Sequence, residues 1–123
     1  MSIRNLQRAL ARLQKGNREF GVEVKSQYLI SLARFTRIKT GALRGNYYVR
    51  RTPVRRFNVE RKIRIPEVVA RSQRRYMRPF GQDAISNPTP YGGYWERIDR
   101  NRSKAFAVLR GLIPGIVART YRR

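Results

Sequence analysis

The sequence predicts an α+β fold, with N-terminal helices and a C-terminal helix packed on a small, mainly antiparallel β-sheet. Apolar residues recur every three or four positions over the first 38 residues, at every second position between residues 46 and 65, and again at helical spacing after residue 103. Helices that precede and follow a run of strands are typical of helices laid on one face of an antiparallel sheet.

The 123 residues fit a single domain. We divide it into a helical region (1–39), a β-rich region with a basic loop (40–87), and a Pro/aromatic turn with the C-terminal helix (88–123). Hydrophobic residues make up 41% of the chain, which is enough for a small core. No apolar run approaches the roughly 20 residues of a membrane span, and the start lacks a secretory signal, so we expect synthesis in the cytoplasm and no membrane partner.

The first predicted helix is amphipathic. Ser2 can cap it, and its apolar and basic residues alternate at helical spacing: Ile3, Leu6, Leu10 and Leu13 against Arg4, Arg8, Arg12 and Lys15. Gly16-Asn17 predicts a break or kink. Two interpretations remain open: a helix that lies on DNA or a membrane, and a helix that packs on a sheet or a neighbouring subunit with its charges in water. The second is favoured.

A second helix is expected from Arg18 to Ile38, with an apolar stripe formed by Val24, Tyr28, Leu32 and Phe35. Gly41 is placed to end this helix with a positive φ, and Lys39 suits the negative end of the helix dipole. The period then changes to two. We expect strands over Asn46–Thr52 and Phe57–Ile65, separated by a turn at Pro53 and closed by Pro66.

The segment from Glu67 to Arg78 has no clear period and carries an arginine cluster, so we expect an extended loop or hairpin. A short strand is expected around Ala84-Ile85, and Asn87-Pro88-Thr89-Pro90 is a stiff turn because two prolines fix φ. Ser103 is predicted to cap a last helix. Pro114-Gly115 is predicted to kink or interrupt it.

The charge is extreme: 29 Lys and Arg stand against seven Asp and Glu, for a net charge of +22. A compact domain with this charge repels itself unless an anionic partner lies nearby, such as nucleic acid, a membrane surface or an acidic protein. Of the 29 basic residues 24 are Arg, whose planar fork matches phosphates and carboxylates. We therefore expect the chain to work within an assembly.

Catalytic side chains are scarce. There is no His and no Cys, so the commonest general base and the thiol nucleophile are missing. Glu19 with Glu23, and Glu96 with Asp99, are the only carboxylates close in sequence, and surface ion pairs are the favoured interpretation of both. We expect no enzyme activity, no cofactor and no metal.

Two motifs carry a family resemblance: Lys39-Thr40-Gly41-Ala42-Leu43-Arg44-Gly45, and later Asn87-Pro88-Thr89-Pro90-Tyr91-Gly92-Gly93-Tyr94-Trp95-Glu96 before the last helix. In this order and spacing, within a chain of this length, they resemble the neck and tail-completion proteins of tailed bacteriophages, the minor tail protein Z-like head–tail connectors. The chain departs from the family pattern before Thr40, after Glu96 and in its high charge.

The resemblance implies a structural virion protein that assembles in the host cytoplasm into a cyclic ring. The ring would join portal or adaptor proteins on the head side to tail proteins and surround a channel for double-stranded DNA, bound without sequence specificity. The residues we expect at the channel or at docking surfaces are strand and loop arginines: Arg50, Arg51, Arg55, Arg56, Arg71, Arg74, Arg75 and Arg78. Those we expect in fold motifs or subunit interfaces are Thr40, Gly41, Leu43, Arg44, Tyr91, Tyr94, Trp95 and Glu96.

Three points stay open at this stage. Arg44 is expected to reach either a helix C-terminus or the carboxylate of Glu96. The aromatic residues Tyr91, Tyr94 and Trp95 are expected either to pack in the core or to anchor a subunit interface. The alternative function is a free basic nucleic-acid-binding module, ribosomal or nucleoid-like, although no known binding motif is present.

Overall fold

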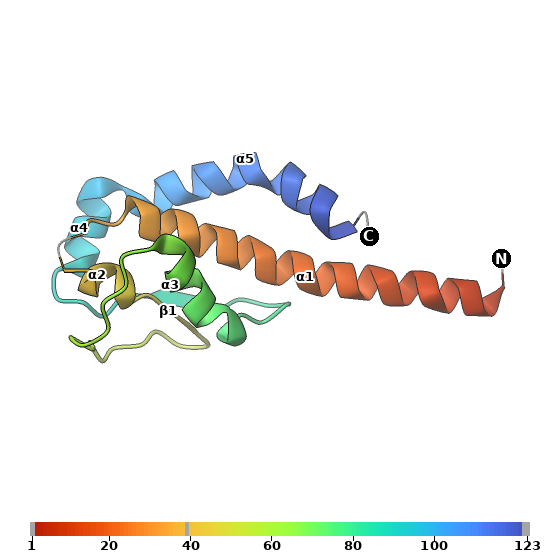
Figure 1. The fold of residues 1–123 in the computed structure, drawn as a ribbon, viewed down its shortest axis with the longest axis horizontal. Helices are drawn as coiled ribbons and strands as arrows, with labels where there is room; N and C mark the ends of the chain where they lie inside the picture. Colours follow the sequence, from red (N-terminus) through yellow and green to blue (C-terminus); the bar gives the residue numbers. More distant parts are fainter. Residues whose placement is uncertain (1, 39, 122–123) are drawn as a thin grey trace.

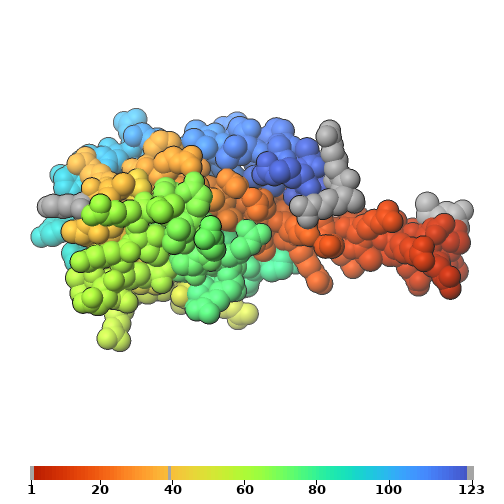
Figure 2. All heavy atoms as spheres, viewed as in Figure 1, coloured from red at the N-terminus to blue at the C-terminus, as the bar shows by residue number. Residues whose placement is uncertain are grey.

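The computed structural model describes residues 2–38 and 40–121. One long helix, α1 (Ile3–Phe35), runs the length of the molecule, and the C-terminal helix α5 (Asn101–Tyr121) lies along its inner half (Figure 1). The remaining elements gather around the C-terminal end of α1. Residues 3–15, which we call the arm, project beyond the body, and every residue in that range is exposed (Figure 2).

Helix α1 is continuous, so the predicted break at Gly16-Asn17 is wrong. Its start is as predicted: the Ser2 side chain accepts a hydrogen bond from the backbone N–H of Asn5 at 3.1 Å. Gly16 is buried because the ring of Tyr121 lies where a larger side chain would stand, 2.8 Å from an added Cβ. The Tyr121 hydroxyl and Asn17 Oδ1 are 2.6 Å apart. The C-terminal end of α5 therefore packs against Gly16 and Asn17 of α1.

Helix α1 ends at Phe35, with Thr36 as its C-cap, which is earlier than the predicted end at Ile38. Gly41 does have a positive φ, of 87°, but it precedes the short helix α2 (Ala42–Gly45) and does not end α1. The proposed dipole role of Lys39 lies outside the described residues. The Thr40–Gly45 motif therefore builds a turn of its own and not a helix stop.

The sheet has two antiparallel strands, β1 (Tyr48–Arg50) and β2 (Ala84–Ser86), with Val49 opposite Ile85. Both lie within predicted strands. The predicted strand Phe57–Ile65 is wrong: this segment is an irregular loop, although its sequence alternates. Its backbone is held by side chains and loops instead, because Asn58 N–H donates to Asn46 Oδ1 at 3.0 Å and Ile63 N–H donates to the Gly41 carbonyl at 3.0 Å.

A helix replaces the extended loop predicted over Glu67–Arg78. Helix α3 (Pro66–Gln73) is followed by a 3₁₀ turn, η1 (Arg74–Tyr76). Pro66 stands at the first helical position, where a missing N–H costs nothing, so it opens α3 and does not merely close a strand. Val69, Ala70 and Gln73 are buried. Burial of this one face against the core stabilises a helix in a segment whose sequence pattern was ambiguous.

Two further helices close the fold. The Pro/aromatic segment, predicted as a turn, forms α4 (Gly92–Asp99), which opens after Tyr91 in the left-handed region at φ 62°. Helix α5 starts at Asn101, so Ser103 lies inside it and is not its cap. Pro114 also lies inside α5, which continues to Tyr121 and curves in Figure 1. Proline removes one backbone bond, which bends the helix without ending it.

The core lies between the inner half of α1 and the elements that cover it. It contains Leu29, Leu32 and Ala33 of α1 with Tyr47, Val49, Val69, Ala70, Met77 and Ala105. The predicted α+β class is confirmed, with far less sheet than the alternating pattern indicated. No described helix has the length and apolar character needed to cross a membrane.

Candidate functional site

The two motifs that are about forty residues apart in sequence meet in space. The Asn87 side chain donates to the Leu43 carbonyl at 2.6 Å, and the Leu43 side chain lies 3.3 Å from the position of a Cβ added to Gly92. Between them is a cavity of about 360 Å³, lined by Arg37, Thr40, Ala42, Leu43, Thr89, Pro90 and Trp95. Gly92 is buried because α2 and α4 approach closely there. We call this contact the motif junction.

Glycine is required twice in the first motif. Gly41 has a positive φ, and its carbonyl accepts hydrogen bonds from Gly45 N–H at 2.8 Å and Ile63 N–H at 3.0 Å. Gly45 has no positive φ, but an added Cβ would collide with the Arg61 carbonyl. The Thr40 hydroxyl accepts from Ala42 N–H at 3.3 Å. The motif is therefore shaped to receive the loop at residues 57–65.

Arg44 is only 8% exposed and binds three backbone carbonyls: Nε donates to Thr36 at 3.0 Å, and the two terminal nitrogens donate to Arg34 at 3.0 Å and Arg64 at 2.5 Å. Burial, together with the nearby Arg34 charge, lowers the pKa of Arg44. The side chain closes the C-terminal end of α1, which is the helix-terminus alternative. The pairing of Arg44 with Glu96 is wrong.

Glu96 pairs with Arg102, whose guanidinium also donates to the Ile85 carbonyl at 2.9 Å. Burial lowers the pKa of Arg102, but the hydrogen bond and charge of Glu96 outweigh this, and the pKa is raised. The buried Tyr47 hydroxyl stands 2.8 Å from Thr36 and 3.5 Å from Glu96, and burial raises its pKa. Glu96 thus ties α4 to α5 through Arg102, and Arg102 in turn bonds the middle residue of β2.

The aromatic residues of the second motif are largely outside the core. Tyr91 is 79% exposed and Tyr94 is 50% exposed. Trp95 is half-buried, packs edge-on to Tyr94 with ring centroids 5.1 Å apart, and carries the Arg37 guanidinium 4.2 Å above its ring. The core-packing interpretation therefore does not hold for Tyr91 and Tyr94. The subunit-interface interpretation remains a prediction.

The predicted arginine set is partly gathered around two tyrosines. The Arg50 guanidinium carbon lies 3.4 Å from the Tyr76 ring centroid and 5.6 Å from that of Tyr48. Arg75 lies 4.8 Å from Tyr76, and Arg61 lies 5.2 Å from Tyr48. We call these five residues the Arg/Tyr cluster. Beside it is a groove of about 620 Å³, lined by Tyr48, Arg50, Val54, Arg56, Phe57, Asn58 and Val59.

The other predicted arginines are placed differently from one another. The exposed ones with no carboxylate partner among the described residues are Arg51, Arg55, Arg56 and Arg71. Arg74 is exposed and pairs with Glu23 of α1 at 3.5 Å. The Arg50 side chain is fixed by hydrogen bonds within the fold: it donates to the Val49 carbonyl at 2.8 Å and to Gln73 Oε1 at 2.7 Å. The set is therefore not one surface.

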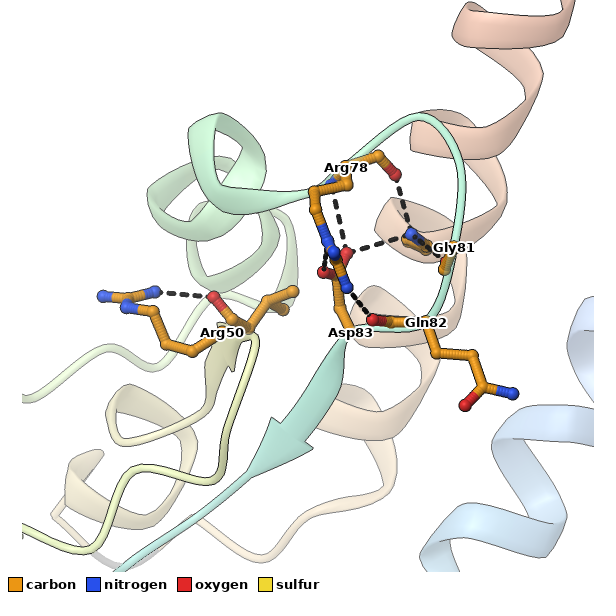
Figure 3. A network of polar contacts seen from close by, with 7 residues as sticks. Arg50, Arg78, Gly81, Gln82 and Asp83 are labelled. Carbon is orange, nitrogen blue, oxygen red and sulfur yellow. Dashed lines mark hydrogen bonds and ion pairs between the residues drawn. The ribbon is translucent and has the colours of Figure 1, made fainter.

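Arg78 belongs to a polar network around the buried Asp83, which we call the anchor (Figure 3). The Asp83 side chain, only 2% exposed, accepts from Lys25 Nζ at 2.9 Å and from Arg78 Nε at 2.8 Å and N–H at 3.0 Å. Burial raises the pKa of Asp83, but the hydrogen bonds from Arg78 and Lys25 outweigh it and lower the pKa. Lys25 also donates to the carbonyls of Arg78 and Gly81. The network fastens the loop before β2 onto α1.

The arrangement suits anion binding. Arg61 donates to the Gly45 carbonyl and the Ser72 hydroxyl, and Arg50 donates to the Val49 carbonyl and Gln73 Oε1. The exposed Arg75 of the cluster and Arg56 in the groove are therefore the guanidinium groups best placed to bind phosphate oxygens. No group of three or more acidic residues that could hold a metal is found in the described part of the chain.

Sequence reasoning missed Arg61, Tyr48 and Tyr76 as members of this surface. The available signal was the arrangement of aromatic residues among the arginines of residues 47–76.

Comparison with known proteins adds no relative: the sequence matches no family model, no curated protein and no solved structure.

Proposed function

We propose that this chain is a structural virion protein of a tailed bacteriophage, a subunit of the neck or tail-completion ring that joins head to tail and surrounds the DNA channel. Its partners are further copies of itself, portal- or adaptor-side and tail-side virion proteins, and double-stranded DNA. The observation that carries the proposal is the motif junction. Two motifs that resemble the family only as a pair form one contact, through Asn87 to Leu43 and Leu43 to Gly92.

Uncovered surface supports the same function. The exposed Tyr91 and Tyr94 belong to the cap and first turn of α4, which lies at the end of the body away from the arm (Figure 1). The arm carries an exposed apolar stripe at the other end. A subunit that contacts neighbours on several sides needs such surfaces, whereas a free monomer rarely exposes them together.

The charge suits a channel. The Arg/Tyr cluster and the exposed arginines Arg51, Arg55 and Arg56 can contact phosphates without reading bases. Contacts of this kind are loose enough for DNA to pass. With a net charge of +22, the ring also requires anionic neighbours to offset its self-repulsion.

The test is assembly of phage particles without this protein. We expect heads and tails that form but do not join, as seen by electron microscopy, with joining restored when the purified protein is added. Normal joined particles in its absence would contradict the proposal.

A free nucleic-acid-binding module is the second candidate, and the Arg/Tyr cluster is the observation that favours it. In that case the purified chain stays monomeric and binds short duplex DNA tightly. Replacing Arg50 and Arg75 by Gln should then reduce the slope of log K against log salt by about one per lost phosphate contact. The matched control is Arg4→Gln with Arg8→Gln on the arm. Ring or partner-dependent assembly decides against this candidate.

A further inference from the structure

Residues 51–65, between β1 and α3, contain no helix or strand, yet they are held to the body along their length. We call this segment the 51–65 loop. It runs along the side of the body opposite α5 (Figure 1). Irregular loops of this length are uncommon in compact domains, and they are usually either disordered or functional. A loop of this length with a fixed position is therefore a candidate binding surface.

Asn46 is the main attachment point of the 51–65 loop. Its side chain is fully buried, and Nδ2 lies 2.8, 3.0 and 3.3 Å from the carbonyl oxygens of Ala42, Asn58 and Arg61. Its Oδ1 accepts from Asn58 N–H at 3.0 Å and from the Tyr48 hydroxyl at 3.2 Å. Both polar atoms of this buried amide are thus satisfied, and a satisfied buried polar group fixes the chain around it.

Further contacts hold the loop on both sides of Asn58. Val54 N–H donates to Ser86 Oγ at 2.9 Å, and Ile63 N–H donates to the Gly41 carbonyl at 3.0 Å. The Arg61 guanidinium turns inward and donates to groups of α2 and α3. The conformation of the loop therefore depends on its backbone and on inward side chains, and not on its other basic residues.

Those other basic residues are exposed and unneutralised. The 51–65 loop has six basic residues and one acidic residue, Glu60. In the described part of the chain, no carboxylate pairs with any of the five that point outward: Arg51, Arg55, Arg56, Lys62 and Arg64. Cations held close together without partners repel one another, and an anionic ligand relieves this repulsion.

The exposed groups of the loop fit a phosphate backbone better than an acidic protein. The cations are spread along the loop, as charges are spread along a nucleic-acid backbone, and most are arginines, whose fork matches phosphate oxygens. Protein interfaces centre on aromatic anchors. Here the rings of Tyr48 and Tyr76 each face a guanidinium group, and Phe57 is half-buried. The loop therefore offers charge without an exposed aromatic anchor.

We infer that the 51–65 loop is a preorganised binding surface for the phosphate backbone of duplex DNA, and that Asn46 is its positioning residue. A loop that is ordered before binding loses little conformational entropy when the ligand arrives, so the same charges bind more tightly than on a flexible segment. The inference deepens the proposed function and rests on it only for the orientation of this loop toward the channel. Binding itself rests on the attachment and the charges of the loop.

The first test removes charge and leaves the attachment intact. Arg55→Gln with Arg56→Gln should reduce the slope of log K against log salt by about two for a duplex of about 20 base pairs, that is by about one per lost phosphate contact. The matched control is Arg8→Gln with Arg12→Gln on the arm, which should leave the slope unchanged. Equal effects of the two pairs, or binding of poly-glutamate as tight as that of the duplex, overturn the inference.

The second test removes the main attachment point and leaves the charge intact. Asn46→Ala should weaken duplex binding by about tenfold at every salt concentration, with the slope unchanged, because ordering of the loop is added to the cost of binding. Trypsin should also cut this loop faster, since released loops are preferred sites of cleavage. Leu109→Ala in α5, which also loses a buried side chain, is the control for stability and should bind as the wild type does. Wild-type affinity of Asn46→Ala contradicts its positioning role.

Gly45→Ala releases the loop without changing Asn46, and it serves where Asn46→Ala does not fold. An added Cβ at Gly45 would collide with the Arg61 carbonyl, so the loop must shift. We expect the same loss of affinity at every salt concentration. Binding as tight as that of the wild type, in a variant whose loop trypsin cuts faster, shows that order in the loop does not matter and overturns the inference.

These outcomes separate the binding surface from the proposed function. If duplex binding depends on the 51–65 loop but particles without the protein still join heads to tails, the binding surface stands and the neck function falls. If the loop variants bind the duplex as the wild type does but particles require the protein, the binding surface falls and the function stands.

Discussion

The two halves of α1 share one helical pattern but have opposite surroundings. In the inner half, residues 16–35, Leu29, Leu32 and Ala33 are fully buried beneath α3, α5 and the strands. In the arm, residues 3–15, the equivalent stripe is about half exposed. The difference shows that an amphipathic helical pattern predicts a face that favours burial, but does not predict which surface buries it. One half of α1 finds that partner within the chain, whereas the stripe of the other half stays exposed among the described residues.

The largest expected difference is between two leucines. Leu32→Ala removes a fully buried side chain and should lower the free energy of unfolding by about 3 kcal/mol. Leu10→Ala, on the arm, should change it by less than about 0.5 kcal/mol in the monomer. Urea denaturation at low salt measures both. Equal losses would show that the arm is covered in the isolated copy.

The anchor on Lys25 gives the next largest effect. Asp83→Asn should cost about 2 kcal/mol at pH 7, because it takes the buried carboxylate away from the half-buried Lys25 and the more exposed Arg78. The pKa of Asp83 is lowered in the fold, so its stabilisation is complete above the ordinary carboxyl pKa of about 4 and is lost as pH falls through the folded value. The difference in unfolding free energy between the wild-type protein and Asp83→Asn should therefore shrink as the pH falls. Urea denaturation at several pH values measures it.

The control for this anchor is Glu67→Gln, which breaks the exposed pair with Arg34 at 3.0 Å. Its cost should stay within about 0.5 kcal/mol. A cost as large as that of Asp83→Asn would mean that solvent exposure does not explain the difference in stabilisation expected between the two ion pairs.

Alanine substitutions at one position in each half of α1 should give the smallest changes in stability, and the two changes should differ in sign. At Gly21, an added Cβ collides with the Pro79 carbonyl, so Gly21→Ala should destabilise by about 1 to 2 kcal/mol although alanine is the better helix former. Gln7→Ala on the arm meets no such neighbour and should be neutral or slightly stabilising. Thermal unfolding of the two variants checks the sign. Stabilisation by Gly21→Ala would mean that the 78–81 loop does not rest on α1.

Much of the local structure could be predicted from the sequence. The cap at Ser2, the positive φ at Gly41 and the strands around Val49 and Ile85 follow from residue type and period. The arm's amphipathic pattern was equally visible. Among the errors, those at Gly16-Asn17, Phe57–Ile65 and Pro66 arose where a local signal for a break, a strand or a stop was outweighed by a tertiary contact.

Two of these errors have a visible physical cause. The helix at Gly16 packs closely against the Tyr121 ring of α5, a contact that favours the unbroken helix. The 57–65 segment alternates, but Asn46, Gly41 and Gly45 take its hydrogen-bonding groups, so it has no strand partner. These hydrogen-bond partners are distant in sequence, so the local alternation of residues 57–65 could not predict them.

The sequence by itself determined the class of fold, the periodic faces of the helices and the charge of +22, because these depend on residue type and local spacing. Only the tertiary structure decided which faces are covered. It turned Arg44 to backbone carbonyls and not to Glu96, brought the two motifs into one junction, and left the arm bare. The reason is that burial and hydrogen-bond partners are set by contacts between distant segments, whose competition no local pattern encodes.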